Sequence, residues 1–112
     1  MSRAKSPSAK NHRRTLKAAK GFKNARSRRI KVAKEAVLHA GQHAYIGRKE
    51  KKRTLRALWI TRLNAAVREH DLSYSKFIDG LNKAKIQLDR KILSDIAVND
   101  PETFSKIVSE IK

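Results

Sequence analysis

"KEKKRTLRALWITRLNAA", residues 49–66, passes from a cluster of cations into an apolar helical pattern. At 100° per residue, one helical face carries Leu55, Trp59, Leu63 and Ala66, with Leu58 and the following Val67 beside them. Trp59, the only tryptophan in the chain, has two interpretations, a platform on which a nucleic-acid base stacks or a core residue. We expect it in the core, because it lies in the middle of the apolar face and aromatic side chains contribute strongly to core burial. The stretch therefore predicts a basic helix that continues into a small helical domain.

Charge is divided unevenly along the 112 residues, whose formal net charge is +18. Residues 1–62 carry 20 lysines and arginines against two acids, Glu35 and Glu50, and so hold a net charge of +18. Residues 63–112 carry eight cations and eight acids and are neutral. Such a field favours a polyanionic partner, and the layout is typical of a basic arm attached to a small globular module. We place the arm at residues 1–54 and a compact all-helical domain at residues 55–112.

Several classes of protein are disfavoured by composition. The chain has no cysteine, which excludes disulfides and thiolate metal sites. No apolar run is long enough to span a membrane, and the N-terminus lacks the apolar region of a secretory signal. The arginine-rich start resembles a mitochondrial transit peptide in composition, but its basic density continues to Arg62, which is too far for a presequence. We therefore expect an intracellular protein.

The basic half is expected to contain a short helix and a long one. Residues 1–14 have almost no apolar side chains, so we expect them to be extended or disordered when the chain is alone. A short helix is predicted from Thr15 and should end at Gly21. From Ala25 to His70 there is no proline, which predicts one long helix of roughly 68 Å at about 1.5 Å per residue.

The long helix has too little apolar surface to be buried by its own chain. Gly41 and Gly47 each cost about 1 kcal/mol relative to alanine rather than necessarily breaking the helix. Its apolar stripe consists mostly of alanine: Ile30, Ala33, Val37, Ala40 and Ala44. A stripe of small side chains buries little area, although it lets another molecule approach closely. We therefore expect the arm to be largely unfolded without its partner and to become helical on it.

Three further helices are predicted in the neutral half from their start signals. Ser73 and Asp89 can each cap a helix that carries apolar residues at helical spacing. Asp100-Pro101-Glu102 combines a capping acid, a proline at the first helical position and another acid in the first turn. Together with the end of the long helix, these segments suffice for a small all-α core.

No catalytic or cofactor site can be built from the pattern. His39 and His43 share a helix face, but Ala40 stands where the zincin motif needs its glutamate. The four glycines are isolated, so there is no phosphate-binding loop, and no nucleophile has a base at a fixed spacing. We expect no enzyme activity, no metal, no cofactor and no small-molecule substrate.

The basic clusters favour a nucleic acid. On a helix they point in several directions, whereas a membrane-surface helix would confine its charge opposite a wide apolar face. A helix-turn-helix built from residues 74–84 and 90–99 is the natural DNA-binding alternative, but its second helix offers only Arg90 and Lys91, at its start. A nucleoid-type DNA-binding protein remains the second hypothesis.

The chain also resembles a known family over nearly its whole length. "HRRTLKAAKGFKNARSRRIKVAKEAV" (residues 12–37) and "LWITRLNAAVREHDLSYSKFIDGLNKAKIQLDRKILSDIAVNDPETF" (residues 58–104) resemble the basic arm and the C-terminal domain of the L-twenty family of bacterial large-subunit ribosomal proteins. It departs from the family pattern at Lys85, a loop position often held by glycine or another turn former, so we expect that loop to differ slightly.

This resemblance implies a protein of the bacterial cytoplasm that binds 23S ribosomal RNA directly, early in assembly of the large subunit. It implies an arm that runs as a long helix into the RNA and a small helical domain at an RNA junction. Neighbouring large-subunit ribosomal proteins are implied as partners. Some members repress translation of their own messenger RNA, which makes that RNA a further candidate partner.

Two groups of residues are the candidate RNA contacts. The arm, with Arg56 just after it, contributes its cations: Arg3, Lys5, Lys10, Arg13, Arg14, Lys17, Lys20, Lys23, Arg26, Arg28, Arg29, Lys31, Lys34, Arg48, Lys49, Lys51, Lys52, Arg53 and Arg56. The compact domain contributes polar residues opposite or beside its apolar stripe and at the next helix start: Thr61, Arg62, Asn64, Arg68, Ser73, Ser75 and Lys76. For any one of the second group the alternative is an ordinary solvated face.

Overall fold

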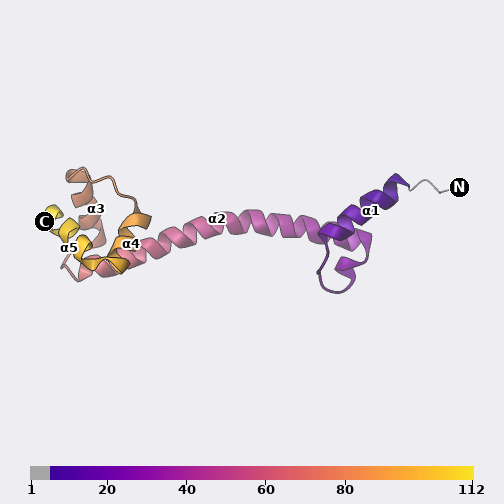
Figure 1. Cartoon of the computed structure of the whole chain (residues 1–112), viewed down its shortest axis with the longest axis horizontal. Helices are drawn as coiled ribbons and strands as arrows, with labels where there is room; N and C mark the ends of the chain where they lie inside the picture. The colour runs from indigo at the N-terminus through magenta and orange to yellow at the C-terminus, as the bar shows by residue number, and fades with distance from the viewer. Residues whose placement is uncertain (1–5) are drawn as a thin grey trace. The chain divides into compact units, whose positions relative to one another are not determined.

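The computed structural model describes residues 6–112, and within that range every regular element is a helix (Figure 1). The elements in chain order are α1 (Pro7–Ala18), a short 3-10 helix η1 (Asn24–Ser27), α2 (Ile30–Arg68), α3 (Tyr74–Lys83), α4 (Arg90–Asn99) and α5 (Pro101–Ile111). The predicted all-α class is confirmed.

The chain divides into two compact units, one up to Lys49 and one from Glu50 to Lys112. The division falls inside α2, whose backbone is helical on both sides of it. The sequence pattern had placed the boundary between residues 54 and 55, where apolar side chains replace cations.

The first helix begins earlier than the sequence analysis predicts. Helix α1 starts at Pro7, so the expectations that residues up to 14 are extended and that the helix begins at Thr15 are wrong for the described residues. Ser6 is the N-cap, and its hydroxyl oxygen accepts a hydrogen bond of 3.2 Å from the amide of Ala9. Proline at the first helical position needs no amide partner, so Ser-Pro is a start signal even without apolar neighbours.

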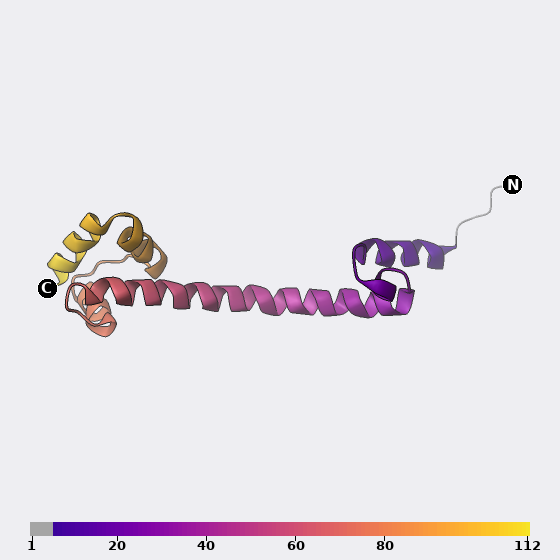
Figure 2. The same cartoon turned by 90° about the horizontal axis from the view of Figure 1, so that it is seen from below.

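The end of α1 and the start of α2 form the centre of the first unit. The chain turns after Ala19, as predicted, with Gly21 in the left-handed region at φ +89°. Both Ala19 and Ala33 are completely buried, and Figures 1 and 2 place the end of α1 beside the start of α2. Alanine lets two backbones approach closely but buries little apolar area. The first unit therefore has a narrow core, as the alanine stripe predicts.

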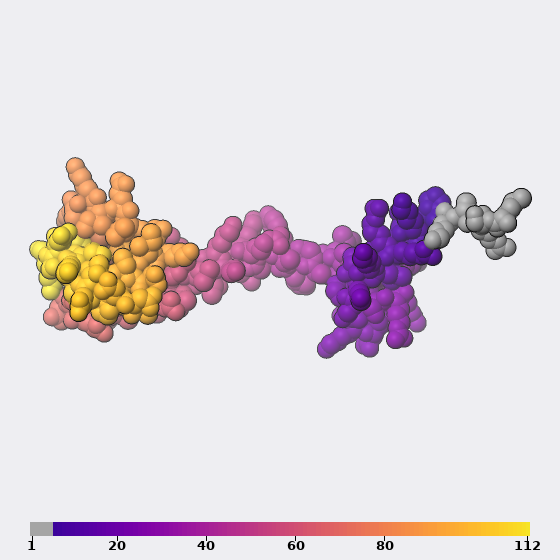
Figure 3. Space-filling model, in the orientation of Figure 1, coloured from indigo at the N-terminus to yellow at the C-terminus, as the bar shows by residue number. Residues whose placement is uncertain are grey.

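Helix α2 runs without interruption past Gly41 and Gly47. Neither glycine has a neighbouring atom within 4 Å of the position that a Cβ would occupy, so neither is required for packing. Every residue from Leu38 to Thr54 is exposed, and no other segment covers the middle of α2 on the face seen in Figure 3.

All three predicted helix starts of the second unit are confirmed. Ser73 caps α3, Asp89 caps α4 and Asp100 caps α5, each accepting a hydrogen bond from an amide three residues later. The bonds measure 3.4 Å, 2.8 Å and 3.3 Å. Hydrogen bonds from the hydroxyl and the amide of Thr103 hold the pKa of the Asp100 carboxyl below its ordinary value, because they stabilise its charged form.

Residues of four helices, α2 to α5, form the core of the second unit. Its buried members are Leu63, Val67, Phe77, Leu81, Leu93, Phe104 and Val108. The rings of Phe77 and Phe104 meet at 5.7 Å between centroids. Trp59 is only half-buried and lies outside this core, so its assignment as a core residue is wrong. It shares the face of Leu63 and Val67, but one turn earlier, and none of the core side chains lies against it.

Helices α3 and α5 approach closely at Gly80, which leads to a first prediction. A methyl group there would meet the side chain of Ile111. Overpacking costs about 1–3 kcal/mol, against roughly 1 kcal/mol that alanine gains over glycine inside a helix. We expect Gly80→Ala to lower the free energy of unfolding by about 1–2 kcal/mol, as measured by urea denaturation.

A matched substitution at Gly41 controls for helix propensity. Gly41 has open space around it, so Gly41→Ala should increase helix content without loss of stability. The close approach of α3 and α5 would be contradicted if Gly80→Ala were as stable as the wild type.

The loop after α3 contains a residue in an unfavourable backbone conformation. Lys85 has φ +57°, and the amides of Lys85 and Ile86 bond to the carbonyls of Asn82 and Leu81, at 3.2 Å and 3.0 Å. These two bonds make a Schellman helix end, in which glycine is the usual left-handed residue. Position 85 is also where the sequence analysis expects the loop to differ.

Glycine at position 85 is therefore expected to stabilise the chain. The left-handed conformation costs a side-chain-bearing residue about 1–2 kcal/mol, and glycine loses part of that gain through its greater freedom when unfolded. We expect Lys85→Gly to raise the free energy of unfolding of the second unit by about 0.5–1 kcal/mol. A urea titration that shows Lys85→Gly to be destabilised would contradict this account of the turn.

Candidate nucleic-acid interface

Cations dominate the surface of the described arm. Every lysine and arginine between residues 6 and 62 is exposed, which includes all candidate arm contacts except Arg3 and Lys5. Arg3 and Lys5 lie outside the described residues. The exposed cations come from three places: α1, the turn and 3-10 segment after it, and two parts of α2, residues 31–34 and 48–62.

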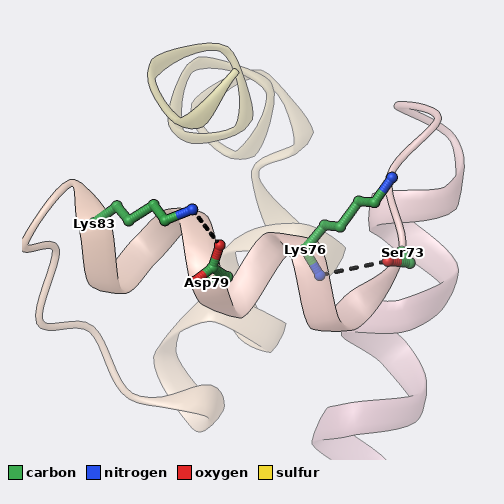
Figure 4. A network of polar contacts seen from close by, with 4 residues as sticks. All are labelled: Ser73, Lys76, Asp79 and Lys83. Carbon is green, nitrogen blue, oxygen red and sulfur yellow. Dashed lines mark hydrogen bonds and ion pairs between the residues drawn. The ribbon is translucent and has the colours of Figure 1, made fainter.

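These cations are not neutralised by their own chain. Between residues 6 and 62 the only carboxylates are Glu35 and Glu50. Among the described residues the structure records a single ion pair, between Lys83 and Asp79 in α3, at 2.7 Å (Figure 4). The arm therefore presents a nearly uncompensated positive field, which attracts polyanions and repels itself when the chain is alone.

The first unit contains a groove of about 630 Å³ beside the start of α2. Its lining is mixed, with cations, an acid, two histidines, one phenylalanine and smaller apolar residues: Gly21, Phe22, Lys23, Arg26, Val32, Glu35, Ala36, His39, Ala40 and His43. No set of three potential metal ligands comes together anywhere in residues 6–112. The two histidines thus lack the further protein ligands that a structural metal needs.

An exposed aromatic residue lies in the middle of α2, outside the residues predicted to contact RNA. Tyr45 is 55% exposed, and the ammonium group of Lys49 lies 4.5 Å from the centre of its ring. Leu38 and Ile46 on the same helix are also exposed, at 74% and 43%. The aromatic surface available for stacking in this region is therefore Tyr45, whereas Trp59 is half-buried. The spacing of Tyr45 and Lys49, four residues apart on a helix, was the available signal.

Three candidates of the compact domain lie together on the last turns of α2. The Nε–H of Arg68 donates to the side-chain oxygen of Asn64, at 3.3 Å. The hydroxyl of Thr61 donates to the carbonyl of Ala57, at 2.9 Å, and so retains only acceptor capacity. The remaining guanidinium donors of Arg68 are the strongest binding groups of this set. Arg62 is exposed and is joined to none of them by a recorded hydrogen bond.

The other three candidates lie at the start of α3, and Figure 4 shows two of them, Ser73 and Lys76. The hydroxyl oxygen of Ser73 accepts from the amide of Lys76 and is thus occupied by the helix cap. Ser75 and Lys76 are exposed in the first turn. Ser73 has a structural function that is sufficient to explain it, and the side chains of Ser75 and Lys76 remain available to a ligand.

None of the helices in residues 6–112 combines the length and the apolar character needed to cross a membrane.

Comparison with known proteins identifies the family. A family model described as ribosomal protein L20 matches residues 2–107. A protein named large ribosomal subunit protein bL20 from Burkholderia ambifaria is 54% identical over 101 residues, which cover 90% of this chain and 85% of that protein. Proteins of the same name from Ralstonia pickettii and Francisella philomiragia are 54% and 55% identical to this chain. Each match covers 90% of this chain and 86% of the length of the relative. The chain belongs to the ribosomal protein L20 family.

Proposed function

We propose that the chain is a structural constituent of the large ribosomal subunit in the bacterial cytoplasm. In this role it binds 23S ribosomal RNA directly and promotes early assembly of the subunit. The observation that carries the proposal is the exposure of every lysine and arginine in residues 6–62, against two acids and no recorded ion pair there. The name of its relatives, large ribosomal subunit protein, supports the same assignment.

The arm supplies most of the binding free energy in this proposal. Each phosphate that a lysine or arginine neutralises releases condensed counterions, which favours binding and makes it strongly dependent on salt. Because cations of the arm occupy two helices and the segment between them, several RNA strands can be held at once. Bringing such strands together is how a protein without a reaction of its own would promote assembly.

The compact domain supplies a second contact. Arg68, with Asn64 and Thr61, binds RNA from the end of α2, and Ser75 and Lys76 bind from the start of α3. These side chains are polar, and all of them are exposed except Asn64, which is half-buried. The core beneath them holds them on rigid helices, which fixes their spacing on the RNA.

No catalysis, cofactor or small-molecule substrate is part of this role. Neighbouring large-subunit ribosomal proteins are the proposed protein partners. Binding of the chain to its own messenger RNA stays a prediction from the resemblance, and the same binding assay with that transcript as competitor would test it.

Competition binding tests the proposal against the DNA-binding alternative. The full chain is bound to labelled 23S ribosomal RNA and challenged with unlabelled 23S RNA or with duplex DNA at equal phosphate concentration. We expect the RNA competitor to displace the probe and the duplex to fail at the same concentration. Equal displacement by duplex DNA would contradict the ribosomal function and favour a nucleoid-type protein.

A further inference from the structure

A hydrogen bond joins the first residues of α3 and α4. Neither of these two residues is among the RNA contacts proposed above. The Nε–H of Arg90 donates to the hydroxyl oxygen of Tyr74, at 2.7 Å, in a partly buried setting. Tyr74 follows the cap Ser73 and Arg90 follows the cap Asp89, so both side chains start from fixed backbone positions.

This bond fixes the guanidinium group but satisfies only part of it. Arg90 has five N–H donors, and the bond to Tyr74 uses the one on Nε. Within residues 6–112 the one recorded ion pair belongs to Lys83 and Asp79, so no carboxylate is recorded as a partner of Arg90. The nearest acid in sequence, Asp89, accepts the amide of Ile92 as a cap. Four donors on the two terminal nitrogens therefore remain for a ligand.

A contribution to stability alone is a weaker explanation of the bond, because Tyr74 is already held by packing against the core cluster. Arginine, however, is the side chain best suited to bind a phosphate through two parallel N–H donors, and a held guanidinium loses less freedom on binding. Exposed Ser75 and Lys76 lie in the first turn of α3, and exposed Lys91 lies in the first turn of α4. The Tyr74–Arg90 bond therefore joins two helix starts that both carry exposed cationic or hydroxyl side chains.

We infer that Arg90 binds a backbone phosphate of the RNA and that Tyr74 is its positioning residue. The inference rests on the proposed function and adds Arg90 and Lys91 to the contacts of the compact domain. The terminal nitrogens of Arg90 face the phosphate, while Tyr74 fixes the plane of the guanidinium through Nε. Neither residue changes the chemistry of the RNA.

A double-mutant cycle tests the pair, with 23S ribosomal RNA as the probe and the full chain as the protein. We expect Arg90→Ala to weaken binding about tenfold and Tyr74→Phe about threefold. In the Arg90→Ala background, Tyr74→Phe should cause no further loss, because it has no guanidinium left to position. Arg90→Lys should retain part of the affinity through its charge and should be insensitive to Tyr74→Phe.

Two controls separate this effect from unfolding and from general charge loss. The midpoint of thermal unfolding is measured for each variant, so that affinities are compared only between folded proteins. Lys83→Ala removes an exposed cation from the other end of α3, where Lys83 pairs with Asp79 (Figure 4), and should leave affinity nearly unchanged.

The outcomes are distinct. Wild-type affinity of folded Arg90→Ala would overturn the inference while leaving the proposed function intact. If the double variant lost affinity by the product of the two single losses, the positioning function of Tyr74 would be overturned. Failure of the wild-type chain to bind 23S RNA would overturn the proposed function and this inference with it.

Discussion

Replacing Phe77 by alanine is expected to unfold the compact part of the chain. Phe77 is completely buried and contacts the ring of Phe104 in a core with only seven buried apolar members. Truncation of a buried phenylalanine to alanine costs about 3–5 kcal/mol, and a domain of this size has a total stability of only a few kcal/mol. The near-ultraviolet circular dichroism of Phe77→Ala and its thermal transition should therefore be lost or strongly reduced at room temperature.

Trp59→Ala is the informative comparison. Trp59 is as large an aromatic residue but lies outside the core, so its loss should cost far less than that of Phe77. If Trp59→Ala unfolded the chain and Phe77→Ala did not, the core as described would be wrong.

Removing three neighbouring cations from α2 is expected to weaken RNA binding strongly. Lys51, Lys52 and Arg53 are exposed, and no ion pair is recorded for them within the described residues. Substituting all three by glutamine keeps good helix formers in place. We expect the affinity for 23S RNA to fall by at least about 30-fold, and the slope of log K against log salt to become shallower by about 2–3, since each phosphate contact contributes about 0.7–0.9.

A second triple variant tests whether position or total charge matters. Lys83 in α3, Lys106 in α5 and Lys112 after α5 are exposed and lie outside α2, and their substitution by glutamine removes the same charge. This variant should bind RNA nearly as well as the wild type. Equal losses from both triple variants would mean that net charge alone drives binding, and would contradict an interface located on the arm. Far-ultraviolet circular dichroism of each variant is compared with that of the wild type, so that a change in helix content is not mistaken for a lost contact.

Most of the second unit could be predicted because its signals are local. Ser73, Asp89 and Asp100 are capping residues followed by apolar residues at helical spacing, and each caps the expected helix. The start of α1 differs from the prediction because Ser6-Pro7 carries the same capping signal as Asp100-Pro101 but has no apolar run after it. Trp59 was misplaced because periodicity defines a helix face but not how far along that face the other helices reach.

For the candidate interface, the sequence predicts which side chains are exposed but not which of them contact one another across helices. Lysine and arginine are almost never buried without a partner, so the cations of a chain with few acids had to be at the surface. The contact between Lys49 and Tyr45 could be predicted from the sequence, since both residues lie on one helix face. The bond between Tyr74 and Arg90 was not, because it joins two helices 16 residues apart and depends on how both pack on the core.

Co-sedimentation with ribosomal subunits tests the central claim most directly. Extracts of cells that produce the full chain are separated on high-salt sucrose gradients, and the chain is located in the fractions by antibody. We predict that the chain sediments with the large subunit and stays there at salt concentrations that remove loosely bound basic proteins. Recovery at the top of the gradient, or with chromosomal DNA, would contradict its function as a structural constituent of that subunit.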